Sequence, residues 1–275
     1  IWKKNGQNRH IRISLAYVIM IILIWIPMAR RKSLAFLDVG QGDCFVADTK
    51  SGAIIFDGGS SSEDQVGRYR ILPYMKYLGY QKIQIAVISH MDIDHYSGIK
   101  ELLEMGKIKY LGLPEIPKDE TMKKIIGIAK KRGTTIFYLS RGRQITTKDG
   151  SLKVLHPQKN SQMEKNAASL VMQGKILGYR VLLTGDVEKE GEEELLSEEL
   201  ERADILKAAH HGSKNSTSNE FLQKVQPKQT VISCGKQNRY GHPHLETIHR
   251  LQTYRTKIYR TDRSGAIIFF KRRDG

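Results

Sequence analysis

Four side chains that could bind a metal lie within six residues of one another, directly after an apolar, strand-like segment. Residues 83–89 form that segment, and His90, Asp92, Asp94 and His95 follow it. Beyond the end of a strand alternate side chains share a face, so the first three can converge while His95 reaches a second position. Zinc and manganese both accept this mixture of imidazole and carboxylate. The spacing therefore predicts a metal site; the alternative is a polar loop whose Asp94 caps the next helix.

Other apolar segments of the chain end in the same types of side chain. The residues in this position are Asp57, Asp186, His210 and His211, with His242 and His244 in a later loop. Each of them alone is equally typical of a turn acid or a polar loop residue. Together, carboxylates and imidazoles at one edge of packed sheets predict a hydrolytic centre with two divalent cations, which activate a water and hold the reacting oxygens.

The elements that must position these side chains are short strands and helices that begin after residue 32. Apolar runs bounded by glycine-containing turns predict strands at 34–39, 44–48, 53–56, 83–89, 135–139, 152–156, 170–173, 180–184, 204–209, 230–233 and 266–270. Helical spacing predicts helices at 71–78, 97–105, 119–132, 187–200, 219–225 and 245–251. Two strand-rich halves, each closed by helices, predict an α+β fold in which two mixed sheets pack face to face with helices outside.

Residues 1–32 differ from the rest of the chain and are expected to form a separate membrane-spanning part, with residues 33–275 as the folded domain. Residues 13–29 are 17 uncharged and mostly apolar residues between basic flanks. This length is at the short end of what crosses a hydrocarbon core of about 30 Å. A signal peptide is the alternative, but its cleavage region would contain residues 30–32, which are all basic. Because the chain starts with Ile, we expect it to be the end of a larger membrane protein.

The basic charge of the chain is concentrated at its two ends. The formal net charge of the 275 residues is +16; residues 1–32 hold seven Lys or Arg and no acid, and residues 255–275 hold seven and two acids. Such ends are typical of a membrane flank, of a solubilising surface, or of a surface that binds a polyanion. The two cysteines, Cys44 and Cys234, are far apart, so neither a zinc–thiolate site nor a disulfide framework is expected.

The order of the motifs resembles a known family. The motifs are LDVGQGD (37–43), FDGG (56–59), SHMDIDHYSG (89–98), LLTGD (182–186), KAAHHGS (207–213) and YGHPH (240–244). Their combination resembles the metallo-β-lactamase superfamily, and within it the hydrolase domain of the ComEC DNA-uptake membrane proteins. The resemblance covers residues 34–270 and implies an αββα sandwich with a site for two metal ions along one edge.

The resemblance also implies roles for individual residues. It assigns His90 and Asp92 to a first ion, and Asp94 and His95 to a second. Asp186 matches the bridging carboxylate, His211 a late ligand, His210 a neighbouring or proton-donating residue, and Asp57 an acid that orients the histidine-rich loop.

Two positions depart from the family's pattern. The usual loop is His-x-His-x-Asp-His, and here Asp92 replaces the second histidine. The family also places a histidine shortly before the bridging aspartate, where this chain has Asn166, with His156 as the nearest histidine upstream. Either Asn166, through its carbonyl oxygen, or His156 could complete the first position. We expect two divalent metal ions, either manganese or zinc. Because the site has fewer nitrogen ligands than the family's usual pattern, manganese is favoured over zinc.

The predicted reaction is hydrolysis of a phosphodiester in single-stranded DNA. The donors that flank the histidine pair and suit phosphate oxygens are Lys207, Ser213, Lys214 and Asn215. Asp94 is expected to serve catalysis, with His210 or His242 as the general acid for the leaving oxygen. The alternatives are a phosphodiesterase on a substrate such as a phosphocholine-bearing polymer, and a DNA-binding domain with a degraded metal site.

The resemblance finally implies a biological setting. We expect the domain to degrade one DNA strand during import, on the outer face of the cell membrane. Its partners would be single-stranded DNA, contacted through its phosphates, the membrane through residues 13–29, and the remainder of the DNA-uptake channel.

Overall fold

The computed structural model describes residues 12–18, 20, 31–163 and 166–271. Residues 12–18 and 20 are helical, and the rest of the predicted membrane span at 13–29 lies outside the described residues. Within the described part of the chain, no helix has the length and apolar character needed to cross a bilayer. The membrane helix therefore stays a prediction. Residues 32–275 form one compact unit.

The first sheet of this unit has seven strands in the order β14-β1-β2-β3-β4-β5-β6. Their bounds are Ser33–Phe36 (β1), Phe45–Thr49 (β2), Gly52–Phe56 (β3), Ile83–Val87 (β4), Ile108–Pro114 (β5), Thr135–Leu139 (β6) and Ile267–Phe270 (β14). β3 to β6 run parallel, whereas β1 is antiparallel to both β2 and β14. The sheet is therefore mixed, as predicted.

The second sheet also has seven strands, in the order β13-β12-β11-β10-β9-β8-β7. Their bounds are Gln144–Thr147 (β7), Gly150–His156 (β8), Val171–Ile176 (β9), Tyr179–Leu183 (β10), Ile205–Lys207 (β11), Gln229–Ile232 (β12) and Lys257–Arg260 (β13). β10 to β13 run parallel, and β7 to β10 pair antiparallel.

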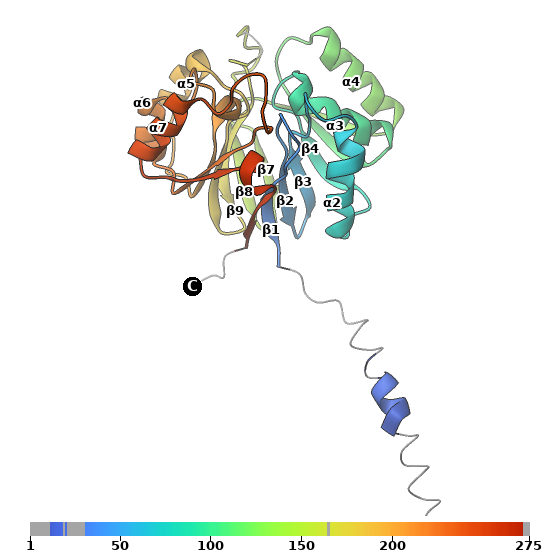
Figure 1. Ribbon diagram of the computed structural model, residues 1–275. Helices are drawn as coiled ribbons and strands as arrows, with labels where there is room; N and C mark the ends of the chain where they lie inside the picture. The colour runs from blue at the N-terminus through green and yellow to red at the C-terminus, as the bar shows by residue number, and fades with distance from the viewer. Residues whose placement is uncertain (1–11, 19, 21–30, 164–165, 272–275) are drawn as a thin grey trace, which may run out of the picture. The chain divides into compact units, whose positions relative to one another are not determined.

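Helices cover the outer face of each sheet (Figure 1). The first sheet carries Gly67–Ile71 (η1), Leu72–Tyr77 (α2), Ile93–Glu104 (α3) and Glu120–Lys131 (α4), and the second carries Lys189–Leu196 (α5), Asn219–Val225 (α6) and Leu245–Thr253 (α7). Two short elements, Ala209–Gly212 (η2) and Thr261–Ser264 (α8), follow β11 and β13.

Three apolar cores separate the four layers. Alternation along β1 shows how: Leu34 and Phe36 point into the core between the two sheets, whereas Ala35 points into the core under α2, α3 and α4. A third core lies between the second sheet and its helices, where Phe221 of α6 is fully buried. The predicted sandwich of two mixed sheets with helices outside is thus confirmed.

Several predicted bounds were wrong, and the start of α3 matters for function. The helix expected at 97–105 begins at Ile93, because the backbone N–H of His95 already bonds to the carbonyl of Asp92 at 3.0 Å. Asp94 and His95 therefore lie in the first helical turn rather than in a loop. A carboxylate there is stabilised by the helix dipole.

Three strands, β5, β7 and β13, had no counterpart in the sequence prediction. β7 and β13 are edge strands whose residues are mostly partly or fully exposed, so they lack the apolar run that marks a buried strand. β5 is interrupted by lysine and glycine, although it is an interior strand, paired on both sides, in the first sheet. The helix expected at 187–200 is shorter and spans Lys189–Leu196.

The parallel strands determine where the functional side chains lie. Asp57 follows β3 and His90 follows β4 in one sheet, and Asp186 follows β10 and His210 follows β11 in the other. Because the carboxyl ends of parallel strands share one edge, each sheet gathers its Asp and His residues along that edge.

Candidate metal centre

Four buried side chains from both sheets converge at this edge. They are Asp43, His95, Asp186 and His211, and one ligand atom of each lies within 4.8 Å of the others. Three of them belong to the predicted ligand set, and Asp43 does not. The side chains come from the β1–β2 turn, the first turn of α3, the turn after β10 and η2.

His95 is held on both sides of its ring. Nδ1 lies 3.0 Å from Oδ2 of Asp57, and Nε2 lies 3.1 Å from Oδ2 of Asp186. Asp57 is itself positioned because its Oδ1 accepts a 2.7 Å hydrogen bond from the backbone N–H of Ser89. Asp57 also has φ +57°, a left-handed conformation that costs free energy in a residue other than glycine. The fold thus holds Asp57 in a strained turn whose carboxylate orients His95.

His211 is oriented in a similar way by a backbone carbonyl. Its Nδ1 lies 2.9 Å from the carbonyl oxygen of Ser233, and its Nε2 lies 3.3 Å from Oδ2 of Asp186 and 3.3 Å from Oδ2 of Asp94. His210 and His211 both have left-handed backbones, with φ of +47° and +52°. Two such residues in sequence are costly and are typical of a functional site.

The charges in the cluster stabilise one another. Burial by itself lowers the pKa of both imidazoles, but the carboxylate of Asp186 and its acidic neighbours outweigh burial and raise the pKa of His95 and of His211 well above the usual range. Burial likewise opposes ionisation of Asp186, yet His211, His95 and Lys207 hold its pKa well below the usual value. In the absence of a metal, the cationic, doubly protonated form of both imidazoles is therefore favoured.

Asp43 lies on the opposite side of the imidazoles from Asp186. Its oxygens are 3.5 Å from Nδ1 of His211 and 3.7 Å from Nδ1 of His95, and its carboxylate contacts the buried ammonium of Lys207. The Nδ1 atoms are already engaged by Ser233 and Asp57, so the Nε2 side, which faces Asp186 and Asp94, is the side of the imidazoles that could hold an ion. Asp43 lies on the Nδ1 side of both imidazoles, and its carboxylate is also close enough to the other three side chains to bind the same ion.

The sequence contains one signal that could have identified Asp43. This signal is the glycine-rich turn at residues 40–42, which Asp43 directly follows. In the structure, Asp43 lies at the same edge as the other acids, and its backbone N–H bonds to the carbonyl of Asp94 at 3.0 Å. Gly59 permits this close packing, since a Cβ there would lie 2.6 Å from the backbone of Asp94 and His95.

His90 and Asp92 form a neighbouring pair. Nε2 of His90 lies 3.7 Å from Oδ2 of Asp92, and the ring centroids of His90 and His95 are 4.1 Å apart. Nδ1 of His90 lies 3.0 Å from the hydroxyl of Ser89, which the sequence analysis did not single out. The structure thus brings the two residues predicted for a first ion beside the cluster that contains the others.

The donor set fits a divalent cation. Nε2 atoms of His90, His95 and His211 are buried and form no hydrogen bond of good geometry with any residue that the structure describes. Buried polar atoms in this state cost free energy. Imidazole nitrogens beside carboxylates are ligands that zinc and manganese prefer.

Comparison with known proteins agrees with this geometry. Residues 37–236 match the model of the metallo-beta-lactamase superfamily, which is more than half of the chain. The chain belongs to this superfamily. A solved member of the fold, the metallo-beta-lactamase fold protein YhfI from Bacillus subtilis, is 13% identical with a TM-score of 0.58, covering 86% of this chain and 99% of that one. At this identity the likeness bears on the fold alone.

Two curated relatives carry names connected with competence. "ComE operon protein 3" of Bacillus subtilis is 35% identical over 278 residues, which is 94% of this chain and 35% of that protein. "Competence protein ComA" of Neisseria gonorrhoeae is 30% identical over 248 residues, which is 86% of this chain and 32% of that protein. The chain therefore spans about a third of the length of these relatives.

His156 is not part of the cluster formed by Asp43, His95, Asp186 and His211. It is fully buried under α5, and its Nε2 is 2.7 Å from the carbonyl oxygen of Ala167 while its Nδ1 is 3.4 Å from Glu194. The prediction that His156 could reach the first metal position does not fit this placement. The backbone carbonyl of Asn166 accepts from the N–H of Ser169, whose hydroxyl in turn lies 3.3 Å from the N–H of Asp186. Asn166 as a ligand stays a prediction.

The two candidate general acids differ in environment. Nδ1 of His210 lies 2.8 Å from Oε1 of Glu188, and its Nε2 lies 3.8 Å from Oδ2 of Asp186. Burial, with the nearby imidazoles of His211 and His210, lowers the pKa of His242 to about 4. His242 is therefore neutral at neutral pH.

The predicted phosphate donors divide into two groups. Lys207 and Ser213 are buried, and the ammonium of Lys207 lies 3.4 Å from Oδ1 of Asp186 and 2.9 Å from the carbonyl of Gly185. Lys207 thus faces the carboxylates of the cluster. Lys214 and Asn215 are more exposed and line a neighbouring pocket of about 730 Å³.

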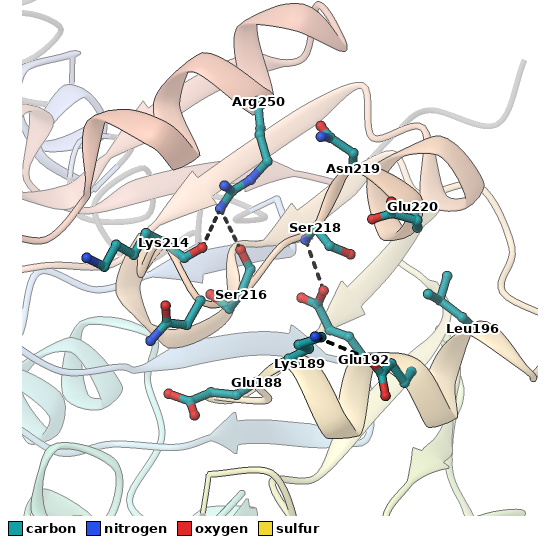
Figure 2. Close-up of a pocket in the computed structure, with 12 residues that line it drawn as sticks. Glu188, Lys189, Glu192, Leu196, Lys214, Ser216, Ser218, Asn219, Glu220 and Arg250 are labelled. Carbon is teal, nitrogen blue, oxygen red and sulfur yellow. Dashed lines mark hydrogen bonds and ion pairs between the residues drawn. The ribbon is translucent and has the colours of Figure 1, made fainter.

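That pocket adjoins the cluster through Glu188, which lines it and contacts His210. The loop at residues 213–218 forms one side of this pocket, and Figure 2 shows the contacts that hold it. The guanidinium of Arg250 donates to the carbonyls of Lys214 and Ser216 at 3.0 and 2.9 Å. From the other side, the buried carboxylate of Glu192 accepts from the backbone N–H of Ser218 at 2.9 Å. The loop that follows the histidine pair is therefore held by hydrogen bonds from both sides.

Proposed function

We propose that this chain is a metal-dependent phosphodiesterase that hydrolyses single-stranded DNA during uptake. The observation that carries the proposal is the convergence of His95 and His211, through their Nε2 atoms, on one carboxylate oxygen of Asp186. Membership of the metallo-beta-lactamase superfamily and the competence names of the relatives support it. The basic character of the chain suits a polyanionic substrate.

In this proposal each residue of the cluster has a defined task. His95, His211, Asp186 and Asp94 hold one divalent cation, and His90 with Asp92 contributes to a second. Such a cation supplies a polarised water and positive charge beside the phosphate. Asp57 and the carbonyl of Ser233 hold the two imidazoles in the tautomer that directs Nε2 toward the ion, as outer hydrogen bonds do in metal sites.

The leaving oxygen receives its proton from His210. Glu188 lies 2.8 Å from Nδ1 of this ring, while Nε2 faces the side of Asp186 at 3.8 Å. His242 borders His210 at a ring separation of 5.3 Å, and its low pKa leaves it to shape the site rather than to donate the proton at neutral pH.

Manganese suits the site better than zinc in this proposal. Asp92, Asp94 and Asp186 provide oxygen ligands, and fewer nitrogen ligands are present than the superfamily's usual loop offers, which favours the harder ion. Elemental analysis of protein purified without added metal checks this. Tightly bound stoichiometric zinc would contradict it.

The setting proposed for the activity is the cell membrane. Residues 13–29 would anchor the chain, and the domain would lie on the outer face beside the remainder of a DNA-uptake channel. Lys214 and Asn215, which line the pocket that adjoins His210 through Glu188, are proposed to contact phosphates of the incoming strand.

The test is cleavage of end-labelled single-stranded and double-stranded DNA across a series of divalent metals. We expect metal-dependent cleavage of the single strand, abolished in His90→Ala and in Asp94→Ala. Cleavage that persists in these variants would contradict the mechanism. Hydrolysis of a small chromogenic diester without cleavage of DNA would instead favour a non-nucleic substrate.

A further inference from the structure

The loop between β12 and α7, residues 233–244, borders the candidate metal centre. Its Gly235 N–H donates a 3.0 Å hydrogen bond to Oε1 of Gln41, in the turn that carries Asp43. Its His242 ring lies 5.3 Å from that of His210 and 6.1 Å from that of His211. The loop therefore lies against the cluster and can contact whatever binds there.

Asn238 fixes the shape of this loop. Its amide Nδ2 donates to the carbonyl of Gly235 at 2.9 Å and to that of His242 at 2.6 Å, and its Oδ1 accepts from the N–H of His242 at 2.9 Å. Three residues later, Gly241 has φ +71°, so the chain turns sharply there. A loop ordered before binding loses little conformational entropy when a ligand arrives.

Three side chains, Arg239, Tyr240 and His242, contact one another in a row along the loop, here called the 239–242 stack. The ring of Tyr240 is nearly parallel to that of His242, at 21° with centroids 5.7 Å apart. The guanidinium of Arg239 lies 4.9 Å from the centroid of Tyr240, and its Nη2 donates to the tyrosine hydroxyl at 2.8 Å. The stack thus leads from the histidines of the cluster to the surface.

The outer end of the stack is open to solvent. Tyr240 is 43% exposed and Arg239 is exposed, whereas His242 is buried beside the cluster. Lys236, in the same loop, is also exposed. Because Tyr240 is exposed, it contributes little to the packing of a core. The loop instead presents an aromatic ring to solvent beside the positive charges of Arg239 and Lys236.

This combination of groups matches one class of ligand. Unpaired nucleobases stack on aromatic rings and on guanidinium planes, while basic side chains contact the flanking phosphates. A base within a duplex has both faces covered by its neighbours, so only an unpaired base can use such a platform.

We propose that the 239–242 stack is a subsite for one unpaired nucleobase, next to the phosphate held at the metal centre. The inference rests on the proposed function, and it adds a reason for preferring single strands over duplex. Stacking tolerates every base, so the subsite selects strand type rather than sequence.

The test is binding of a fluorescently labelled single-stranded oligonucleotide to the full chain in a metal chelator, where hydrolysis cannot interfere. Tyr240→Ala should weaken binding about tenfold or more, the effect expected from the loss of one stacked base. Tyr240→Phe should bind like the parent chain. Arg239→Lys keeps the charge but loses the plane, and should weaken binding more than charge alone predicts.

A matched control is Tyr77→Ala. Tyr77 is 70% exposed and ends α2, three residues before Tyr80, which bonds to Lys32 and Asp48 at the edge away from the cluster. The affinity of Tyr77→Ala for the single-stranded oligonucleotide should equal that of the parent chain. Thermal unfolding of each variant checks that the fold is intact.

Oligonucleotides with a single abasic residue, moved along the strand, separate stacking from distortion of the loop. At one position the missing base should weaken binding to the parent chain, and the loss caused by Tyr240→Ala should be at least several-fold smaller there. Unchanged affinity of Tyr240→Ala, or an equal loss at every abasic position, would overturn the subsite.

The two proposals fail separately. Base-dependent binding through Tyr240 without any metal-dependent cleavage would refute the hydrolytic function and retain the subsite. Metal-dependent cleavage with no effect of Tyr240 on single-strand affinity would do the reverse.

Discussion

Nδ1 of His95 lies 3.0 Å from Oδ2 of Asp57, and both side chains are fully buried. This contact joins the first turn of α3 to the turn after β3 and directs Nε2 of the same ring to Asp186, 3.1 Å away in the turn after β10. One imidazole therefore connects the two sheets at the edge where the candidate metal centre lies.

Asp57→Asn should weaken metal binding without removing any proposed ligand. An amide keeps the size of the side chain and tolerates a positive φ, but it cannot accept from both Ser89 and His95 with carboxylate strength. Loss of such an outer hydrogen bond typically costs roughly 10- to 100-fold in metal affinity. Competition with a coloured chelator measures the change.

Asp204→Asn is the matched control for this change. Asp204 is also buried, but it precedes β11 and accepts from the N–H of Arg180 at the opposite edge. This variant should be less stable and should keep its metal affinity. Equal affinities of the Asp57 variant and the parent chain would show that His95 needs no such support.

Lys207→Met should destabilise the metal-free chain. The buried ammonium of Lys207 contacts the carboxylates of Asp43 and Asp186, and its removal leaves both with less compensation. Breaking a buried ion pair costs about 3–5 kcal/mol of the free energy of unfolding. A divalent cation brings positive charge to the same carboxylates, so part of this loss should return on adding manganese, as urea unfolding would measure.

Lys228→Met provides the comparison. Lys228 lies 2.9 Å from Asp204, but its side chain is 60% exposed, so solvent screens the pair. We expect a loss below about 1 kcal/mol and no response to metal. A similar small loss in Lys207→Met would mean that the buried lysine does not neutralise the cluster.

The stability of the metal-free chain should fall on both sides of a window in mildly acidic solution. The pKa values of His95 and His211 are raised above the usual 6.5, so their contribution is complete below pH 6.5 and is lost as the pH rises through the raised values. The pKa of Asp186 is lowered below the usual 3.8, so its contribution is present above that pH and is lost as the pH falls through the lowered value.

Urea unfolding in a chelator, from about pH 5 to about pH 9, tests the alkaline side of this window. Saturating manganese should abolish the alkaline loss, because metal binding takes up the neutral imidazoles and releases their protons. A free energy of unfolding that is constant up to alkaline pH in the chelator would contradict the raised pKa values.

His156→Gln should separate structure from metal binding. His156 donates to or accepts from groups under α5 and lies outside the cluster, so the variant should lose about 1–3 kcal/mol of stability through an unsatisfied buried group. Its metal affinity should match that of the parent chain, whereas His211→Gln should bind metal much more weakly. A tenfold loss of affinity in His156→Gln would restore it as a candidate ligand.

Local patterns in the sequence predicted most of the elements. The strand at 135–139 and the helix at 219–225 have the bounds that their apolar spacing indicates. The edge strands β7 and β13 escaped prediction because an edge position leaves side chains exposed and removes the apolar run. The start of α3 was placed too late because the polar residues Asp94 and His95 occupy its first turn and break the helical pattern.

The sequence by itself determined which side chains stand at the ends of the strands, because a strand and the turn that follows it are local features of the chain. Together with the family resemblance, this pattern led to the prediction of metal ligands at His90, Asp92, Asp94, His95, Asp186 and His211, and of Asp57 as the acid that orients the histidine-rich loop. Only the tertiary structure decided which of these meet. Asp43 joins them, since the β1–β2 turn packs against Gly59 and α3, and His156 does not, because β8 directs it beneath α5. That choice depends on how two sheets pack across their whole width, and no stretch of sequence contains this information.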